Sequence, residues 1–459
     1  MGEEKLPAAF VSGMKELAGE TLDEFLDSYN APRTHGLRLN RLKSDGADQA
    51  VRALISMFEL TPVPWCADGY YYEETMRPGR HPYHAAGLYY IQEPSAMSAV
   101  EMLNPQPGET ILDLAAAPGG KTSHIASKMT GKGLLVSNEI HPERARILAE
   151  NVERMGIDNA VVTCAAPDEL ARRFPASFDR IMLDAPCSGE GMFRKDPGAI
   201  EEWSPALVEL CVARQWDIIQ EAYVMLKPGG TLAYSTCTFN KAENEEMVER
   251  MLAQYPDLEL LKMERFWPHL QRGEGHFVAV VRKRGGASDE LEGGVQDTRP
   301  AGRGGKRAKQ APEQAAYQAF LEWAREDLPG FVPTSGRPLL FGDELYWLPE
   351  NASWTWTERQ LRGLKIPRAG LHLAHLKKNR IEPAHALAMA SRPEQAARSW
   401  NLSADSPEIA AFLRGETLPV DPDYRGWTLV TTDGLPVGWG KASSGQLKNH
   451  LPKGLRSLR

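Results

Sequence analysis

The sequence predicts an α/β protein built around a mostly parallel sheet, with further domains before and after it. Two observations carry this prediction. From Leu88 to Lys283, short apolar runs alternate with segments of helical periodicity, and a glycine-rich turn joins the first run to a helix. Buried apolar strands that alternate with helices are typical of parallel sheets. The chain has 459 residues, 42% of them hydrophobic, which is enough for about three domains.

Six apolar runs are predicted to be strands of this sheet. They lie at residues 110–115, 133–139, 160–164, 178–186, 231–237 and 275–283. Helices are expected directly after the glycine turn and at three further places, because their apolar residues recur at helical spacing and glycines follow two of them. These further helices lie at 141–156, 205–230 and 243–255.

The regions outside this sheet are predicted to form separate units. Residues 17–30 and 49–60 have helical periodicity, and residues 37–43 alternate like a strand. Residues 285–312 are rich in glycine and charge, as linkers are. We therefore expect an N-terminal α+β region at 1–87, the sheet domain at 88–284, a flexible linker at 285–312, a first C-terminal domain at 313–395 and a second at 396–459.

Composition excludes several classes of protein. No run approaches the roughly 18 apolar residues of a membrane-spanning helix. The first 17 residues lack the basic and apolar regions of a secretory signal. The five cysteines are scattered and form no CxxC pair, which argues against a disulfide framework or a zinc ribbon and favours a reducing cytoplasm. We expect a cytoplasmic monomer that binds no metal and no membrane.

Positive charge is concentrated in two stretches near the end of the chain. The formal net charge is −8, which by itself argues against a nucleic-acid partner. Residues 359–380, however, contain seven Lys or Arg, residues 437–459 contain five, and neither stretch contains an acid. Clustered Lys and Arg side chains can bind the phosphates of a nucleic acid even when the whole chain is acidic.

The glycine turn and a following acid predict an adenosine-containing ligand. In DLAAAPGGKT (113–122), the turn between a strand and a helix lets a ligand approach the backbone at the carboxyl edge of the sheet. The spacing is not that of a P-loop. Glu139 ends the second strand, where an acid typically binds ribose hydroxyls. The alternatives are a turn that only helps a helix to pack and a glutamate that only faces solvent.

Two cysteines are predicted to face one cleft. Asp184 and Cys187 follow the fourth strand, in DAPCSGEG, and Cys237 follows the fifth, in STCT. In the strand order 1-4-5 these ends are neighbours, and Lys121 of the glycine turn would help to lower the pKa of a thiol there. The alternative is that both cysteines are buried filler, as we expect of Cys66, Cys164 and Cys211.

An adenosine cofactor, an acid and two thiols together suit the methylation of carbon 5 of a pyrimidine. A thiolate is a strong nucleophile near neutral pH, and its addition to carbon 6 turns the ring into an enamine. The enamine can attack the methyl group of S-adenosylmethionine. Release then requires loss of the carbon-5 proton and of the enzyme thiol, a step that a second thiol can assist.

These motifs resemble those of the Nop/Sun family of RNA cytosine-5 methyltransferases. The resemblance covers residues 88–283 and includes YIQEPSAM (90–97), LKPGG (226–230) and GEGHF (273–277). It implies a Rossmann-like class I methyltransferase domain with a mixed, mostly parallel sheet. It also implies that Cys237 is the nucleophile and that Cys187 assists release.

The resemblance implies further roles in binding. Asp184 would hold the cytosine edge or the methionine end of the cofactor, and Glu139 would hold the ribose. The cofactor would be lined by Ala115, Ala116, Ala117, Pro118, Gly119, Gly120 and Lys121. The family commonly has an aspartate near adenine, where this chain has Ala166; Asp168 could substitute for it.

The end of the chain carries a second resemblance. Residues 426–456 are similar to the PUA-like end of bacterial RsmF-type enzymes, which methylate 16S ribosomal RNA. This implies a ribosomal RNA partner, with aromatic residues and the basic side chains of Lys441, Lys448, Lys453 and Arg456 on the RNA. The alternatives are a tRNA substrate, an inactive RNA-binding assembly factor and, for the basic residues, a solvated tail.

Overall fold

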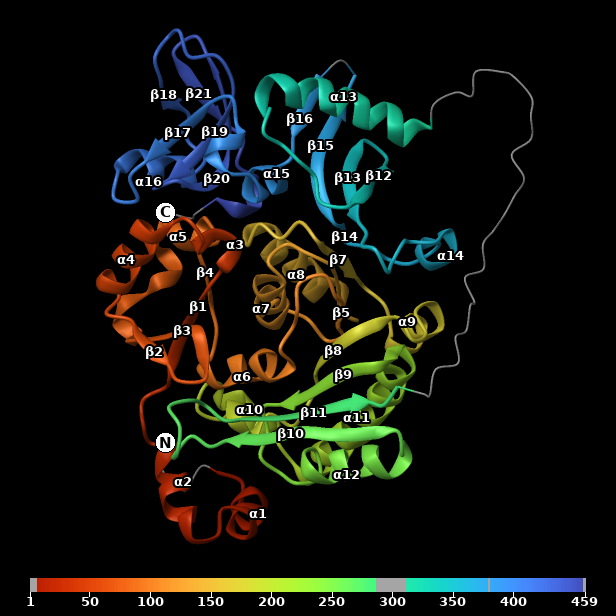
Figure 1. Cartoon of the computed structure of the whole chain (residues 1–459). Helices are drawn as coiled ribbons and strands as arrows, with labels where there is room; N and C mark the ends of the chain where they lie inside the picture. Colours follow the sequence, from red (N-terminus) through yellow and green to blue (C-terminus); the bar gives the residue numbers. More distant parts are fainter. Residues whose placement is uncertain (1–5, 286–310, 379, 457–459) are drawn as a thin grey trace, which may run out of the picture.

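The structure is a computed structural model that describes residues 6–285, 311–378 and 380–456 (Figure 1). Most of the predicted linker at 285–312 lies outside the described residues. Four sheets are present in the described part of the chain, and the largest has eight strands. No described helix is both long enough and apolar enough to cross a bilayer.

The eight-stranded sheet confirms the predicted mixed, mostly parallel architecture. Its order is β10-β11-β9-β8-β5-β6-β7-β14, and the five inner strands from β9 to β7 are parallel. The outer strands β10, β11 and β14 are antiparallel to their neighbours. In chain order the strands are β5 (Thr110–Asp113), β6 (Leu134–Asn138), β7 (Ala160–Thr163), β8 (Phe178–Asp184), β9 (Leu226–Thr236), β10 (Leu258–Phe266), β11 (His276–Lys283) and β14 (Arg368–Ala369).

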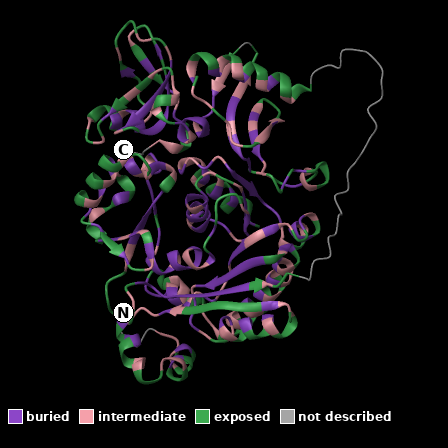
Figure 2. Ribbon diagram, viewed as in Figure 1, coloured by how far each residue is buried: buried purple, intermediate pink, exposed green. Residues whose placement is uncertain are grey.

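Helices cover both faces of this sheet and create two cores. Neighbouring strand residues point to opposite faces, so Ile111 enters one core and Leu112 the other. The Ile111 face is covered by α6 (Pro94–Leu103), α7 (Gly120–Met129) and α8 (Pro142–Arg154). The Leu112 face is covered by α9 (Pro167–Arg173), α11 (Pro205–Met225) and α12 (Glu245–Gln254). In Figure 2 the inner strands of the sheet are largely buried, whereas α11 and α12 also carry exposed and intermediate residues.

Two predicted helices have different bounds in the structure. The helix expected at 205–230 ends at Met225, because Leu226 is already extended and begins β9. The helix expected at 17–30 is interrupted: α1 (Ala8–Ala18) ends at Gly19, whose φ is +55°, and α2 (Leu22–Ser28) follows. A positive φ suits glycine and stops a helix.

The N-terminal region is packed against the last C-terminal unit. It forms the sheet β2-β3-β1-β4, from β1 (His35–Leu39), β2 (Thr61–Val63), β3 (Cys66–Tyr72) and β4 (Tyr89–Ile91), with α4 (Asp48–Met57). The last unit forms β17-β19-β20-β21-β18, from β17 (Ser399–Leu402), β18 (Leu418–Pro419), β19 (Gly426–Thr432), β20 (Leu435–Ser443) and β21 (Gln446–Asn449), with α16 (Pro407–Leu413). The two units share one hydrophobic core. The hydroxyl of Tyr83 also donates to Asp433 at 2.8 Å.

The first C-terminal unit adds the last strand to the central sheet. It contains α13 (Pro312–Asp327) and the sheet β12-β13-β15-β16, from β12 (Gly336–Phe341), β13 (Glu344–Pro349), β15 (Leu371–Lys377) and β16 (Arg380–Pro383). Strand β14 precedes β15 and pairs with β7 (Figure 1). Trp354 and Trp356 lie against Phe174 beside this junction. This unit therefore completes the central sheet.

Candidate active site

The glycine turn lies at the carboxyl end of β5. Gly119 has a φ of +115° and precedes α7. A Cβ at Gly119 would lie 3.2 Å from Leu148 Cδ1, so both the space and the conformation favour glycine. Asp113 is fully buried and ends β5; its Oδ2 accepts a hydrogen bond from Thr122 at 2.6 Å. Its Oδ1 has no partner among the described residues, which leaves one acceptor for a bound ligand.

Burial raises the pKa of Asp113 to about 7. The hydrogen bond from Thr122 and the charge of Lys121 act in the opposite direction. Burial therefore disfavours the ionised form of Asp113, and a ligand that donates a hydrogen bond to its free oxygen would favour that form.

Glu139 is buried at the end of β6 and is tied to the glycine turn. Its carboxylate accepts from the backbone N–H of His141 at 3.0 Å and pairs with Arg144 at 3.2 Å. Arg144 also donates to the carbonyl of Ala117 at 2.9 Å. The turn and the acid are therefore held side by side by one guanidinium group, as an adenosine site at this edge requires.

The end of the third parallel strand has an alanine where the related enzymes commonly have an aspartate. Ala166 is half-buried and is the N-cap residue of α9. Asp168, the suggested substitute, is exposed and forms an ion pair with Arg172 at 2.7 Å. An aspartate in the first turn of a helix that pairs with the residue four positions later is stabilised where it is.

Asp184 is the charged centre of the site. Its Oδ2 lies 2.8 Å from Lys121 Nζ and its Oδ1 accepts from Ser235 Oγ at 2.8 Å. Burial acts to raise the pKa of Asp184, but the charge of Lys121 and the hydrogen bonds from Lys121 and Ser235 hold that pKa below its usual value. The carboxylate is therefore ionised at neutral pH. The ammonium of Lys121, which was predicted to lower the pKa of a thiol, pairs with this carboxylate.

His276 lies behind this carboxylate on β11. Its Nε2 is 4.0 Å from Asp184 Oδ1, and its side chain is buried. Burial and the charge of Lys121 lower the pKa of His276 to about 3, so the imidazole is neutral. Its Nε2 has no hydrogen-bond partner in the described residues.

The two cysteines that follow β8 and β9 are in contact. Cys187 Sγ and Cys237 Sγ lie 3.4 Å apart, and both side chains are half-buried. The hydrogen bond with Cys237 and burial raise the pKa of Cys187 well above its usual value. By contrast, Cys66, Cys164 and Cys211 are buried, as expected for filler residues.

A buried carboxylate braces the Cys187 loop. Glu243 accepts from the backbone N–H of Ser188 at 3.0 Å, from Gln215 at 2.7 Å and from Asn240 at 2.8 Å. Gln215 also donates to the carbonyl of Pro186 at 3.0 Å. These bonds fix the residues on both sides of Cys187.

A second carboxylate joins the two cysteine loops. Glu190 Oε2 accepts from the backbone N–H groups of Phe239 at 2.7 Å and Asn240 at 2.9 Å. The N–H of Gly191 donates to the carbonyl of Cys237 at 2.8 Å. A Cβ at Gly191 would lie 2.9 Å from that carbonyl oxygen, so this contact needs glycine.

The N-terminal helices support the same loops from behind. Aromatic residues of α1 and α2 pack in one cluster with Phe193 and Phe239. Arg194 forms a buried ion pair with Glu274 at 2.7 Å and donates to the carbonyl of Ser28 at 2.8 Å. The region to which the sequence assigned no function thus helps to hold the two cysteine loops.

Of the four basic residues predicted to bind RNA, two are cross-strand neighbours, a third is exposed elsewhere and the fourth is half-buried. Lys441 and Lys448 are exposed cross-strand partners on β20 and β21. Lys453 is exposed in the last turn, whereas Arg456 is half-buried and donates to the carbonyl of Leu451 at 3.1 and 3.2 Å.

The aromatic residues expected on the RNA beside these lysines include two tryptophans that are not available for stacking. Trp427 and Trp439 are 5% and 1% exposed and belong to a hydrophobic core. Trp439 donates to the carbonyl of Ala384 at 3.1 Å. Buried rings that fill a core have no free face for a base.

Four residues of the site were missed from the sequence. Asp113 ends a strand, as Asp184 does, so the same rule could have found it. Glu190 and His276 lie inside the motifs that were noted, but pattern alone does not say what they contact. For Glu243 no signal existed, because only the fold brings it to the Cys187 loop.

Comparison with known proteins finds matches along most of the chain. Residues 100–282 match the family model of 16S rRNA methyltransferase RsmB/F. Residues 6–94 match the N-terminal domain of 16S rRNA methyltransferase RsmF. Residues 322–390 match the RsmF rRNA methyltransferase first C-terminal domain, and residues 400–457 match the methyltransferase RsmF PUA domain.

Individual relatives agree with these matches. The chain is 32% identical to ribosomal RNA small subunit methyltransferase F of Aliivibrio fischeri, over 98% of this chain and 97% of the relative. It is 33% identical to the protein of that name from Klebsiella pneumoniae, over 98% and 96%. A methyltransferase homolog from Pyrococcus horikoshii aligns with a TM-score of 0.55 and 28% identity, over 62% of this chain and 100% of that one.

Proposed function

The chain belongs to the RsmF family of 16S ribosomal RNA methyltransferases, and from this premise we propose that it forms 5-methylcytosine by covalent catalysis. The family establishes an S-adenosylmethionine-dependent methyltransferase that acts on 16S ribosomal RNA. The proposal adds which atom is methylated and which residues act. One observation carries it: Cys187 Sγ and Cys237 Sγ lie 3.4 Å apart at the carboxyl ends of neighbouring parallel strands.

The residues at this edge of the sheet fit S-adenosylmethionine, which supplies an electrophilic methyl group when bound. Ala115–Lys121 and Glu139 would hold it, because the turn exposes backbone beside a buried acid. The unpartnered Oδ1 of Asp113 supports this fit, since a buried acceptor without a donor is costly unless a ligand supplies one. Ala166 provides no acid for adenine, so its recognition would rest on backbone and apolar contacts.

Cys237 is proposed as the nucleophile. Its sulfur forms a bond with carbon 6 of cytosine, and the electrons displaced from the 5,6 double bond make carbon 5 nucleophilic towards the methyl group. The carbon-5 proton is then lost to water. Its bonding electrons restore the 5,6 double bond as the sulfur–carbon bond breaks, and Cys237 leaves as a thiolate.

Cys187 is proposed to assist that departure. Its raised pKa keeps it protonated, and a thiol 3.4 Å from Cys237 Sγ can donate a hydrogen bond to the departing thiolate. Asp184 is ionised and ends the strand that leads to Cys187, so it is proposed to accept from the exocyclic amino group of cytosine. Lys121 and Ser235 hold this carboxylate in place.

The remaining parts of the chain are proposed to bind the RNA outside the target base. The cross-strand pair Lys441 and Lys448, with Lys453, would contact phosphates. The matched segments support the predicted division into units at 1–87, 88–284, 313–395 and 396–459.

Methylation mapping tests the proposal. The full chain is incubated with S-adenosylmethionine and either free 16S ribosomal RNA or small subunits from a strain without this activity, and bisulfite sequencing then locates 5-methylcytosine. We expect protected cytosines with the wild-type protein and none with Cys237→Ala. Methylation of another atom, or turnover by Cys237→Ala with the same binding of S-adenosylmethionine, would contradict it.

A further inference from the structure

A carboxylate and two imidazoles converge on the sheet of the first C-terminal unit, far along the chain from the two cysteines. His372 Nε2 lies 2.7 Å from Glu344 Oε2, and His375 Nδ1 lies 2.6 Å from the same oxygen. The three ligand atoms all lie within 4.8 Å of one another. Glu344 comes from β13 and both histidines come from β15.

A β-bulge puts these side chains on one face of the sheet. On a regular strand, residues three apart point to opposite faces, so His372 and His375 would be separated. Here Leu345 pairs with Ala374 and Tyr346 pairs with His372, which leaves Leu373 as an extra residue. The bulge returns His372 to the face of His375, and Glu344 is directly opposite His375.

The contacts are close, yet they are not hydrogen bonds. Oε2 of Glu344 and Nε2 of His372 are both buried and, within the part of the chain that the structure describes, neither has a hydrogen-bond partner. The imidazole nitrogens therefore approach the carboxylate oxygen away from the direction of an N–H bond. Three potential metal-ligand atoms within 4.8 Å of one another, two of them buried without a hydrogen-bond partner among the described residues, are an arrangement that a cation could satisfy.

We propose that Glu344, His372 and His375 bind one zinc ion. Two imidazole nitrogens and one carboxylate oxygen form a common ligand set for zinc, with bonds of about 2.0–2.2 Å. The ligand atoms, now 2.6–2.7 Å apart, need only open around the ion. Glu382 on β16 is directly opposite His375 in the next strand pair and so faces the same side, where its carboxylate pairs with Arg380 at 2.6 Å.

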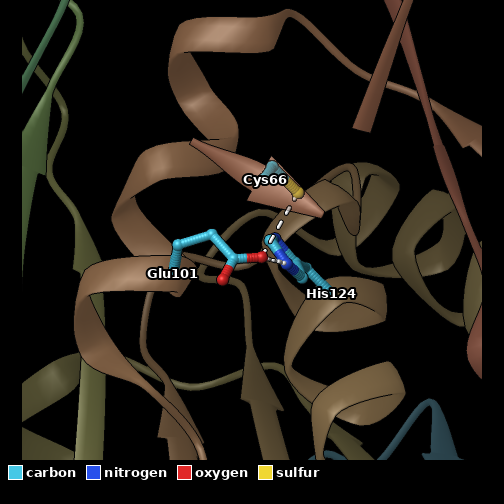
Figure 3. Close-up of side chains that lie close together, drawn as sticks. All are labelled: Cys66, Glu101 and His124. Carbon is cyan, nitrogen blue, oxygen red and sulfur yellow. Dashed lines mark hydrogen bonds and ion pairs between the residues drawn. The ribbon is translucent and has the colours of Figure 1, made fainter. Parts of the chain in front are cut away.

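A second cluster of this kind among the described residues is already joined by hydrogen bonds (Figure 3). The Cys66 thiol and His124 Nε2 bond to the same oxygen of Glu101 at 3.2 and 3.0 Å, and Lys128 donates to the other oxygen at 2.6 Å. A metal there would have to displace these bonds beside a lysine ammonium. Glu344, His372 and His375 have no such bonds to lose.

The proposed ion would lie at the junction of three parts of the chain. Tyr346 stacks on His372, with 4.6 Å between ring centroids. Both residues line a cavity of about 240 Å³ whose other walls include Arg146 of α8 and Leu455 of the last unit. A zinc ion would cross-link β13 to β15 at this wall and so stiffen the packing of the C-terminal units on α8.

Metal titration of the full chain, without an affinity tag and after treatment with a chelator, tests the proposal. Zinc is added in competition with a chromophoric chelator. We expect one tight site per chain in the wild type. Loss of a residue that only contacts a metal ligand lowers metal affinity roughly 10- to 100-fold, so His375→Ala, which removes a ligand itself, should lower zinc affinity by more than that. His375 is 40% exposed, so its truncation should be tolerated by the fold.

Glu344→Gln provides a second variant of nearly the same shape, and Cys66→Ala is the matched control for the other cluster. Zinc should raise the melting temperature of the wild type and of Cys66→Ala, but of neither site variant. Cobalt should give a visible spectrum without a thiolate charge-transfer band. The proposal is overturned by the absence of a tight site, by unchanged zinc affinity in both site variants, or by a thiolate band that Cys66→Ala removes.

Discussion

The contact between Gly191 and Cys237 yields a quantitative prediction about the nucleophile. In Gly191→Ala, the new Cβ would lie 2.9 Å from the carbonyl oxygen of Cys237, 3.1 Å from that of Gly275 and 3.3 Å from that of Glu274. All three atoms are backbone, so none can rotate away. The φ of Gly191 is not among the positive values, so alanine causes a steric problem here and not a conformational one.

The displacement sets the size of the effect. Ordinary contact begins at 3.4 Å, so the Cys237 loop must retreat by about 0.5 Å from a Cβ at 2.9 Å. A misplacement of about 1 Å can cost about 100-fold in rate, so half of it is expected to cost about tenfold. Overpacking should also lower the free energy of unfolding by about 1–3 kcal/mol.

The assay is methyl transfer under single-turnover conditions, well below the melting temperature, with the dissociation constant of S-adenosylmethionine measured in parallel. We expect the rate to fall about tenfold while cofactor affinity stays unchanged, because the glycine turn is not touched. Gly13→Ala is the matched control, since a Cβ there meets nothing within 4 Å. A wild-type rate in Gly191→Ala would refute the claim that this contact positions Cys237.

Three further predictions concern release, cofactor and RNA. Cys187→Ala should still attack and methylate, but should accumulate a protein–RNA adduct that survives denaturing electrophoresis; no adduct would assign release to other groups. Glu139→Ala should weaken S-adenosylmethionine by about 1–3 kcal/mol in calorimetry, the usual loss for a hydrogen bond to a charged group. Unchanged affinity would place the ribose elsewhere. Lys441→Ala with Lys448→Ala should weaken RNA binding and reduce the salt slope by about one unit per lost contact; an unchanged slope would mean that this pair only faces solvent.

The parallel core and the meeting of the two thiols could be predicted from the sequence for one physical reason. Carboxyl ends of parallel strands share an edge of a sheet, so residues that follow the fourth and fifth strands must be neighbours if those strands pair. Strands β8 and β9 do pair, and the predicted proximity of Cys187 and Cys237 is confirmed at 3.4 Å. The glycine turn and Glu139 meet at the same edge for the same reason.

Features that depend on pairing between distant segments could not be predicted. Strand β10 was missed because most of its residues are exposed and show no alternation. Strand β14 has two residues, too few for any pattern. The spacing of His372 and His375 suggests opposite faces of a strand, and only the extra Leu373 in the pairing with β13 brings them together.

Charge partners were also beyond the sequence. Lys121 was expected to act on a thiol, because both belong to the same cleft. The structure gives its ammonium a closer acceptor, Asp184 at 2.8 Å. Which of two acceptors a lysine binds depends on distances of an ångström or two, and a pattern of residues contains no such information.

The pairing of β14 with β7 has a consequence for attempts to dissect this enzyme. A fragment that ends at residue 285 would leave the outer edge of β7 with unpaired N–H and C=O groups, and Phe174 and Phe178 without their tryptophan neighbours. Such bare edges recruit other strands and promote aggregation. The two halves are better regarded as complementary pieces of one catalytic body, suited to split-protein reassembly, than as an enzyme with a removable RNA-binding tail.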